Sequence, residues 1–195
     1  MGPDPERYQR ALDALAAVAS GQPKPLFDAE AEKAKAKARE RALKLLDQRA
    51  RSRAELSRRL AAADFEPELI EAVLDDLAAV RLIDDAAFAR QWVEQRRRRR
   101  GKSARMLDHE LERKGVIAAD RAAALATIDP EEEREQALRL AQKKAGTLSA
   151  APADRRDRDK QLRRIVGVLA RRGYPQAMSV ELAKQALDER IAELS

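Results

Sequence analysis

Three stretches of ten residues decide the fold: LSRRLAAADF at 56–65, LDHELERKGV at 107–116 and IVGVLARRGY at 165–174. Each begins with an apolar residue, has a leucine four residues later, and has a bulky apolar or aromatic residue five residues after that. The first spacing places two side chains on one face of a helix. In two copies a glycine, Gly115 or Gly173, precedes the bulky residue, where a left-handed helix end suits glycine. The pattern therefore predicts a helix that ends inside each stretch.

The spacing of these copies predicts a tandem array. They are offset by 51 residues and then by 58, and a second helical pattern follows each copy. Such self-similarity is typical of repeat architectures. A unit of about 45 residues buries too little surface to be stable alone, so neighbouring units are expected to share interfaces. The predicted fold is all-α: an elongated array of three tandem three-helix repeats of helix-turn-helix-like form, preceded by an N-terminal helix and a linker.

Caps, prolines and glycines give the predicted boundaries. The apolar spacing from Tyr8 to Val18 indicates an N-terminal helix, and a long helix is predicted after Asp28. Its early part has only alanine to bury and is expected to be solvated, whereas three later leucines are expected to face a core. These leucines are Leu43, Leu45 and Leu46. The predicted segments are 1–37, which holds the N-terminal helix, the linker and a charged extension, and the repeats 38–81, 82–128 and 129–195. The predicted helices of the repeats run over 38–50, 53–63, 67–80, Asp84 or Asp85 to Gly101, 103–114, 118–128, Pro130 to Gly146, 159–172 and 176–193, with a polar loop at 147–158.

Composition bounds the class of protein. Hydrophobic residues make up 44% of the chain, but only 3% of residues are aromatic and much of the rest is alanine, so small, shared cores are expected. Cysteine is absent, which excludes a disulfide framework and thiolate chemistry. No apolar run approaches the roughly 18 residues that span a bilayer, and the N-terminus has no signal-peptide pattern. We therefore expect a soluble intracellular protein.

The sequence offers little for catalysis. The only histidine, His109, lies off the apolar stripe of its helix and is expected to be solvated. The acidic pairs Asp75-Asp76 and Asp84-Asp85 are adjacent in sequence, and neighbours on a helix point about 100° apart, which is poor geometry for a two-carboxylate site. Asp84 is better explained as a helix cap. Because no metal-ligand spacing and no phosphate-binding glycine loop is present, we expect neither an enzyme nor a cofactor or metal site.

The charge distribution predicts a polyanionic partner. Residues 90–114 hold ten lysines and arginines against four acids, and residues 134–172 hold twelve against four. Residues 64–85 run the other way, with eight acids against Arg81 alone. Basic zones of this kind are typical of contact with nucleic acid or with an acidic protein surface. Solubility and pairing with helix dipoles are the alternative explanation for these charges.

The candidate contact residues lie in these zones. The candidates for nucleic-acid or filament contact are Arg96, Arg97, Arg98, Arg99, Arg100, Lys102, Arg105, Lys143, Lys144, Arg163, Arg164, Arg171 and Arg172. The candidates for contact with a partner protein are Glu68, Glu71, Asp75 and Asp76. Five successive helical arginines sweep more than a full turn, so two or three of them are expected to share a face. The aromatic residues are expected in the cores, so nucleic-acid contact should be electrostatic and weakly sequence-selective. These aromatic residues are Phe65, Phe88, Trp92 and Tyr174.

The stretch LIDDAAFARQWVEQRRRRRGKSARMLDHELERKGV, residues 82–116, resembles the signature region of the RecX family of regulatory proteins. The residues that carry the resemblance are Leu82, Ile83, Asp84, Asp85, Phe88, Ala89, Trp92, Val93, the arginines before Gly101, Leu107, Glu110, Leu111, Lys114, Gly115 and Val116. Residues 53–56 and 169–174 also resemble the repeats of that family, and the resemblance covers about residues 38–190.

The resemblance implies tandem three-helix repeats and a cytoplasmic, non-catalytic modulator of the RecA recombinase. From the residues themselves we expect a monomer, because no repeat presents a spare, strongly apolar face. Such proteins inhibit growth of the RecA filament, ATP hydrolysis, strand exchange and co-protease activity, and so modulate DNA repair and the SOS response. They lie in the groove of the filament or at its ends, and many bind single- or double-stranded DNA weakly. Two other functions fit the residues alone: a DNA-binding protein without sequence preference, and a helical scaffold whose charges serve solubility.

Overall fold

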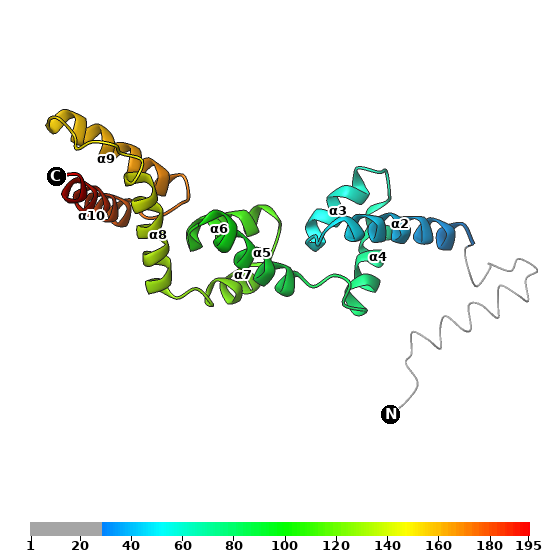
Figure 1. Cartoon of the computed structure of the whole chain (residues 1–195). Helices are drawn as coiled ribbons and strands as arrows, with labels where there is room; N and C mark the ends of the chain where they lie inside the picture. Colours follow the sequence, from blue (N-terminus) through cyan, green and yellow to red (C-terminus); the bar gives the residue numbers. More distant parts are fainter. Residues whose placement is uncertain (1–28) are drawn as a thin grey trace, which may run out of the picture.

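The computed structural model describes residues 29–195 and shows an all-α chain, as predicted. Nine helices within that range form three bundles of three, arranged in a row along an elongated molecule (Figure 1). Each bundle has its own cluster of buried apolar side chains. The helix predicted from Tyr8 to Val18 lies outside the described residues. None of the helices between residues 29 and 195 is both long enough and apolar enough to span a bilayer.

Bundle 1 consists of α2 (Ala29–Gln48), α3 (Arg53–Ala61) and α4 (Pro67–Ala79). Ser52 caps α3, since its hydroxyl oxygen accepts the N–H of Glu55, and Pro67 opens α4 at a position where a missing N–H costs nothing. The helix α2 faces the core through Ala38, Ala42 and Leu45, which share one face. The prediction for Leu43 is wrong: its side chain points away from that face and is 37% exposed.

Bundle 2 consists of α5 (Asp85–Arg100), α6 (Ala104–Arg113) and α7 (Ala118–Leu125). The predicted cap role of Asp84 is confirmed, because its carboxylate accepts the N–H of Ala87. The predicted end at Gly101 is also confirmed, since this residue has a left-handed backbone with φ of 57°. The bundle core consists of Phe88, Ala89, Val93, Leu107, Leu111, Val116, Ala124 and Ile128.

Bundle 3 consists of α8 (Pro130–Ala145), α9 (Arg155–Ala170) and α10 (Gln176–Leu194). The helix α8 buries alanines at four-residue spacing, so α9 and α10 approach it closely. The predicted start of α9 at residue 159 is wrong. Asp154 caps the helix by accepting the N–H of Asp157, and α9 therefore begins at Arg155. The loop predicted over 147–158 is correspondingly shorter.

The three repeated stretches form the middle helix of each bundle and the turn after it. Their paired apolar residues are all fully buried, namely Leu56 and Leu60, Leu107 and Leu111, and Ile165 and Leu169. Gly115 and Gly173 adopt the predicted left-handed conformation, with φ of 77° and 86°. In bundle 1 the same position is held by Asp64, with φ of 59°. The repeat predicted from sequence is therefore a structural repeat.

Candidate nucleic-acid interface

The bundles meet at two joints in which the middle helices lie end to end. At the joint between bundles 1 and 2, called joint 1–2, the hydroxyl of Ser52 donates to the carbonyl of Lys114 at 2.6 Å. At the joint between bundles 2 and 3, called joint 2–3, the N–H of Ser103 donates to the carbonyl of Arg172 at 3.0 Å. Both serines are buried. The C-terminal end of each following middle helix thus abuts the N-terminal end of the previous one.

A carboxylate from the following bundle completes each joint. The first N–H of α3, from Arg53, donates to Asp85 at 2.8 Å, and the first N–H of α6, from Ala104, donates to Glu133 at 2.6 Å. Helix N-termini carry N–H groups without intrahelical partners, and these carboxylates satisfy one of them in each joint. Burial raises the pKa of Asp85, and the N–H of Arg53 opposes that shift.

The glycines are required because the joints are tight. A Cβ on Gly115 would overlap the Cβ of Ala54 in bundle 1. A Cβ on Gly173 would lie 2.7 Å from both the Cβ of Met106 and the hydroxyl of Ser103 in bundle 2. Carbon atoms in contact lie about 3.5–4.0 Å apart, so any larger residue would separate the bundles. Both glycines are therefore needed for two reasons: the left-handed turn at the helix end and the close approach of the neighbouring bundle.

Opposite charges surround joint 1–2. The ammonium of Lys114 lies 2.8 Å from a carboxylate oxygen of Glu55, which Arg49 also contacts at 3.0 Å. Burial favours the neutral form of Glu55, but hydrogen bonds from Arg49 and Lys114 outweigh it and lower the pKa of Glu55 to about 2. Lys114 also lies 4.1 Å from the ring centroid of Trp92, and Arg96 lies over the same ring at 4.1 Å.

Joint 2–3, in contrast, lies beside a cleft of about 670 Å³ that is rich in cations. We call it the cationic cleft; its lining residues are Arg98, Arg99, Arg100, Gly101, Gln136, Arg139, Leu140, Lys143, Lys144, Thr147, Val168, Arg171 and Arg172. The cations come from the end of α5, from α8 and from the end of α9, and no carboxylate is among the lining residues. The two basic zones of the sequence therefore meet in one cleft.

The structure places seven of the thirteen predicted cations in this cleft. They are Arg98, Arg99, Arg100, Lys143, Lys144, Arg171 and Arg172. One of them also holds the joint, because Arg172 donates from Nε to the carbonyl of Arg100 at 3.2 Å. The polar wall residue Gln136 donates to the carbonyl of Arg97 at 2.8 Å, so side chains of bundle 3 cap the end of α5.

Four other predicted cations lie elsewhere. Arg96 stacks on Trp92, and Arg97 is mostly buried and lies 3.4 Å from Glu132. Lys102 is mostly buried and pairs with Glu110. Burial disfavours ionisation of Glu110, but the hydrogen bonds from Lys102 and Trp92 prevail and lower its pKa. Arg105 lies in a separate groove of about 500 Å³ beside exposed His109.

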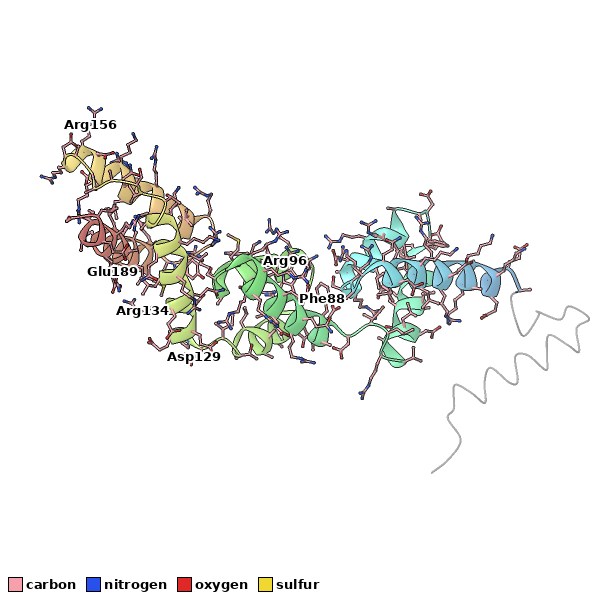
Figure 2. The ribbon with its side chains drawn as sticks, in the orientation of Figure 1. Phe88, Arg96, Asp129, Arg134, Arg156 and Glu189 are labelled. Atoms are coloured by element: carbon pink, nitrogen blue, oxygen red, sulfur yellow. The ribbon has the colours of Figure 1, made fainter. Side chains whose placement is uncertain are left out.

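The last two predicted cations, Arg163 and Arg164, lie on the solvent face of α9. At 100° per residue, this face also holds Arg156, Lys160 and Arg171, all exposed. Figure 2 shows Arg156 at the outer end of α9, directed away from bundle 3. The face forms a cationic stripe that reaches the cleft at Arg171. We call these five residues the α9 stripe.

Sequence reasoning missed Arg139 in the cleft, and Arg156 and Lys160 in the α9 stripe. The signal for the stripe was present, since Arg156, Lys160 and Arg164 follow one another at four-residue spacing. Arg156 was lost because the helix was predicted to begin at residue 159, whereas Lys160 lay inside the predicted helix and could have been found from its spacing to Arg164. Arg139 lies one turn before Lys143 on α8 and could have been found in the same way.

The acidic candidates are engaged mostly within bundle 1. Asp76 pairs with Lys35 at 2.9 Å and with Arg39, and hydrogen bonds from these two cations lower its pKa. Asp75 and Glu71 both pair with Arg53, at 2.8 and 2.6 Å. Of the four candidates, Glu68 is exposed and forms no ion pair among residues 29–195. The early part of α2, expected to be solvated, is therefore exposed but attached to α4 through these pairs.

Comparisons with known proteins agree with this architecture. Family models of the first and second three-helix domains of RecX match residues 38–77 and 84–125. A regulatory protein RecX from Corynebacterium efficiens is 60% identical over 97% of this chain and 90% of its own. One from Mycobacterium avium is 48% identical over 72% of this chain and 79% of its own. The crystal structure of RecX from Lactobacillus salivarius covers 81% of this chain and 99% of its own with a TM-score of 0.68 at 22% identity, which supports the fold.

Proposed function

Because the chain belongs to the RecX family of regulatory proteins, we propose that it binds the RecA–DNA filament and inhibits the activities of the RecA recombinase. Family membership confirms the expectation of a regulatory protein rather than an enzyme. The inhibited activities are filament growth, ATP hydrolysis, strand exchange and co-protease activity, so the protein modulates DNA repair and the SOS response. The proposal places it in the cytoplasm as a monomer.

The cationic cleft and the α9 stripe carry the nucleic-acid part of the proposal. Their side chains are directed to solvent and have few acidic neighbours, which is the arrangement that attracts phosphates. No aromatic residue is among the lining residues of the cleft or in the α9 stripe, and Trp92 lies beside joint 1–2. We therefore expect contact with the sugar–phosphate backbone, weak and without base preference.

The elongated array explains how modest contacts add up. Three bundles joined end to end can touch several points of a long partner at once, and linked contacts bind more strongly than separate ones. A filament offers both protein walls and phosphates to such an array. Bundle 3 with its cleft is proposed to meet the DNA, and Glu68 on bundle 1 is proposed to meet protein.

The test is hydrolysis of ATP by RecA on single-stranded DNA, titrated with the intact chain. A filament regulator inhibits at protein concentrations far below those that coat the DNA. Inhibition only at coating concentrations would favour the second candidate, a DNA-binding protein without sequence preference, which the same cationic cleft supports. Unchanged hydrolysis at all concentrations would refute both and leave a helical scaffold.

Two matched variants locate the contact. The cleft variant changes Arg99, Lys143 and Arg171 to glutamate, and each of these side chains is exposed. The control variant changes Lys33, Lys37 and Arg41 to glutamate; these residues are exposed on α2. Both lose the same net charge. We expect inhibition to weaken strongly in the cleft variant and little in the control variant.

A further inference from the structure

The two joints have opposite electrostatics. At joint 1–2 the facing groups attract each other, as in the pair of Lys114 with Glu55. At joint 2–3 the end of α5 presents Arg99 and Arg100, and bundle 3 presents lysines and arginines across the same cleft. These facing groups repel each other. The same architecture is thus held by charge at one joint and opposed by charge at the other.

The repulsion at joint 2–3 is only partly compensated. Arg98 and Arg139 each have an acid one turn away, Glu94 at 3.5 Å and Glu135 at 3.2 Å. The other six cleft cations form no ion pair within residues 29–195; they are Arg99, Arg100, Lys143, Lys144, Arg171 and Arg172. Two acids also act at this joint, because Glu132 pairs with Arg97 and Glu133 accepts the N–H of Ala104. Neither lines the cleft.

Within the described part of the chain, a small number of hydrogen bonds and one ion pair hold joint 2–3 together. The most closely packed pairs of helices all lie within a single bundle, so no long helix–helix interface crosses the joint. The N–H of Ser103 donates to the carbonyl of Arg172, and the hydroxyl of Tyr174 donates to the carbonyl of Gly101 at 3.2 Å. Gln136 and Arg172 donate to the carbonyls of Arg97 and Arg100. The remaining contacts are the N–H of Ala104 on Glu133 and the ion pair of Arg97 with Glu132. Individual bonds of this kind contribute modestly in water. Like charges can therefore shift the balance between a closed and an open joint.

We propose that joint 2–3 is a clamp that a bound polyanion closes, while joint 1–2 stays rigid without one. Phosphates in the cationic cleft contact cations from both bundles and convert their repulsion into attraction. Joint 2–3 is then flexible in the free protein and becomes rigid when the polyanion is bound. This inference rests on the proposed function for its ligand but not for its salt dependence, which follows from the cations alone.

Salt provides an independent test because it acts on the two joints in opposite directions. The Debye length falls from about 30 Å at 0.01 M to about 3 Å at 1 M ionic strength. Added salt weakens the attraction at joint 1–2 and relieves the repulsion at joint 2–3. The distribution of distances across joint 2–3 should therefore narrow and shift to shorter values. The distribution across joint 1–2 should remain unchanged or broaden.

The experiment measures distances between spin labels in the intact chain by double electron–electron resonance. The chain lacks cysteine, so labels can be placed at will. Ala119→Cys with Ala192→Cys reports on joint 2–3, and Ala36→Cys with Ala119→Cys reports on joint 1–2; all three positions are exposed. The probe is a short fluorescein-labelled oligothymidylate, whose binding is followed by anisotropy in the same samples.

We expect the oligothymidylate at low salt to narrow the distribution across joint 2–3 and to leave joint 1–2 unchanged. Lys143→Glu should narrow the distance distribution across joint 2–3 without a ligand, whereas Lys184→Glu on the exposed face of α10 should leave it unchanged. Oligothymidylate that binds without changing joint 2–3 overturns the clamp and leaves the proposed function intact. If the oligothymidylate fails to bind, the proposed DNA contact is wrong, but the salt experiment still tests the clamp. Distances across joint 2–3 that are the same at low and high salt overturn the clamp proposal.

Discussion

The substitution Gly115→Ala tests the joint architecture most directly. Gly115 has φ of 77°, where a residue with a Cβ costs about 1–2 kcal/mol relative to the ordinary helical region. Its Cβ would also overlap that of Ala54 in bundle 1. Overpacking a tight site costs typically about 1–3 kcal/mol. We therefore expect a loss of roughly 2–5 kcal/mol in the free energy of unfolding, or an open joint 1–2.

A second substitution separates the two contributions. In Gly115→Ala with Ala54→Gly the overlapping methyl is gone, and the nearest remaining atom is the Cα of residue 54 at 3.9 Å, an ordinary contact. The cost of the left-handed backbone stays. Ala54→Gly alone, in the first turn of α3, should cost no more than about 1 kcal/mol. The double variant should thus be more stable than the sum of the single variants predicts, by about 1–3 kcal/mol.

The measurement is urea unfolding followed by circular dichroism and by the fluorescence of Trp92, which lies beside joint 1–2. The four proteins form a double-mutant cycle. Gly101→Ala provides a contrast, since its new Cβ would meet the flexible end of Leu140 at 2.9 Å and should cost mainly the backbone strain. Strict additivity of Gly115→Ala and Ala54→Gly would refute the reasoning, because it would mean that the two residues do not touch.

Three further predictions follow from the charges and the hydrogen bonds. For single-stranded DNA each neutralised phosphate contributes about −0.7 to the slope of log affinity against log salt, so the cleft variant should lose about 2 units of slope and the control variant almost none. Because the pKa of Glu55 is lowered, its ionised carboxylate stabilises joint 1–2 fully above pH 4.5, and this stabilisation should be lost as the pH falls towards about 2. The fluorescence of Trp92 should change over the same pH range, and Glu55→Gln should remove this pH dependence. Tyr174→Phe leaves the carbonyl of Gly101 without its donor and should cost roughly 1–3 kcal/mol in urea unfolding.

Local signals made most of the fold predictable. Caps act within a few residues, so Asp84, Gly101 and Asp129 could be assigned from their neighbours in sequence. The repeated apolar spacing identified the middle helices, because burial of one helix face imposes that period wherever the helix packs. The start of α9 escaped this reasoning, since its first turns have no apolar stripe and Asp154 lies in a polar stretch with several possible caps.

The candidate site was only partly predictable because pairing between distant residues decides it. The arginine run is continuous in sequence, yet Arg97 turns to Glu132 on another bundle and Lys102 turns to Glu110 on the next helix. Neither partner can be chosen without knowing how the helices pack. The joint had a sequence signal, since Ser52 and Ser103 have the same offset as the apolar repeat. Two buried serines at equivalent positions indicate a repeated polar contact.

The residues of the joints also explain why the two outer ends of the array differ from its interior. At the end of α3, the left-handed position is held by Asp64, whose side chain is exposed. At the far end, the position equivalent to Ser103 is Gln161, inside α9, because α9 begins about two turns earlier than α6 does. Those extra turns occupy the place where the middle helix of another bundle would abut. A left-handed glycine paired with a buried serine thus marks a joint, and the chain from residue 29 to residue 195 contains two such pairs.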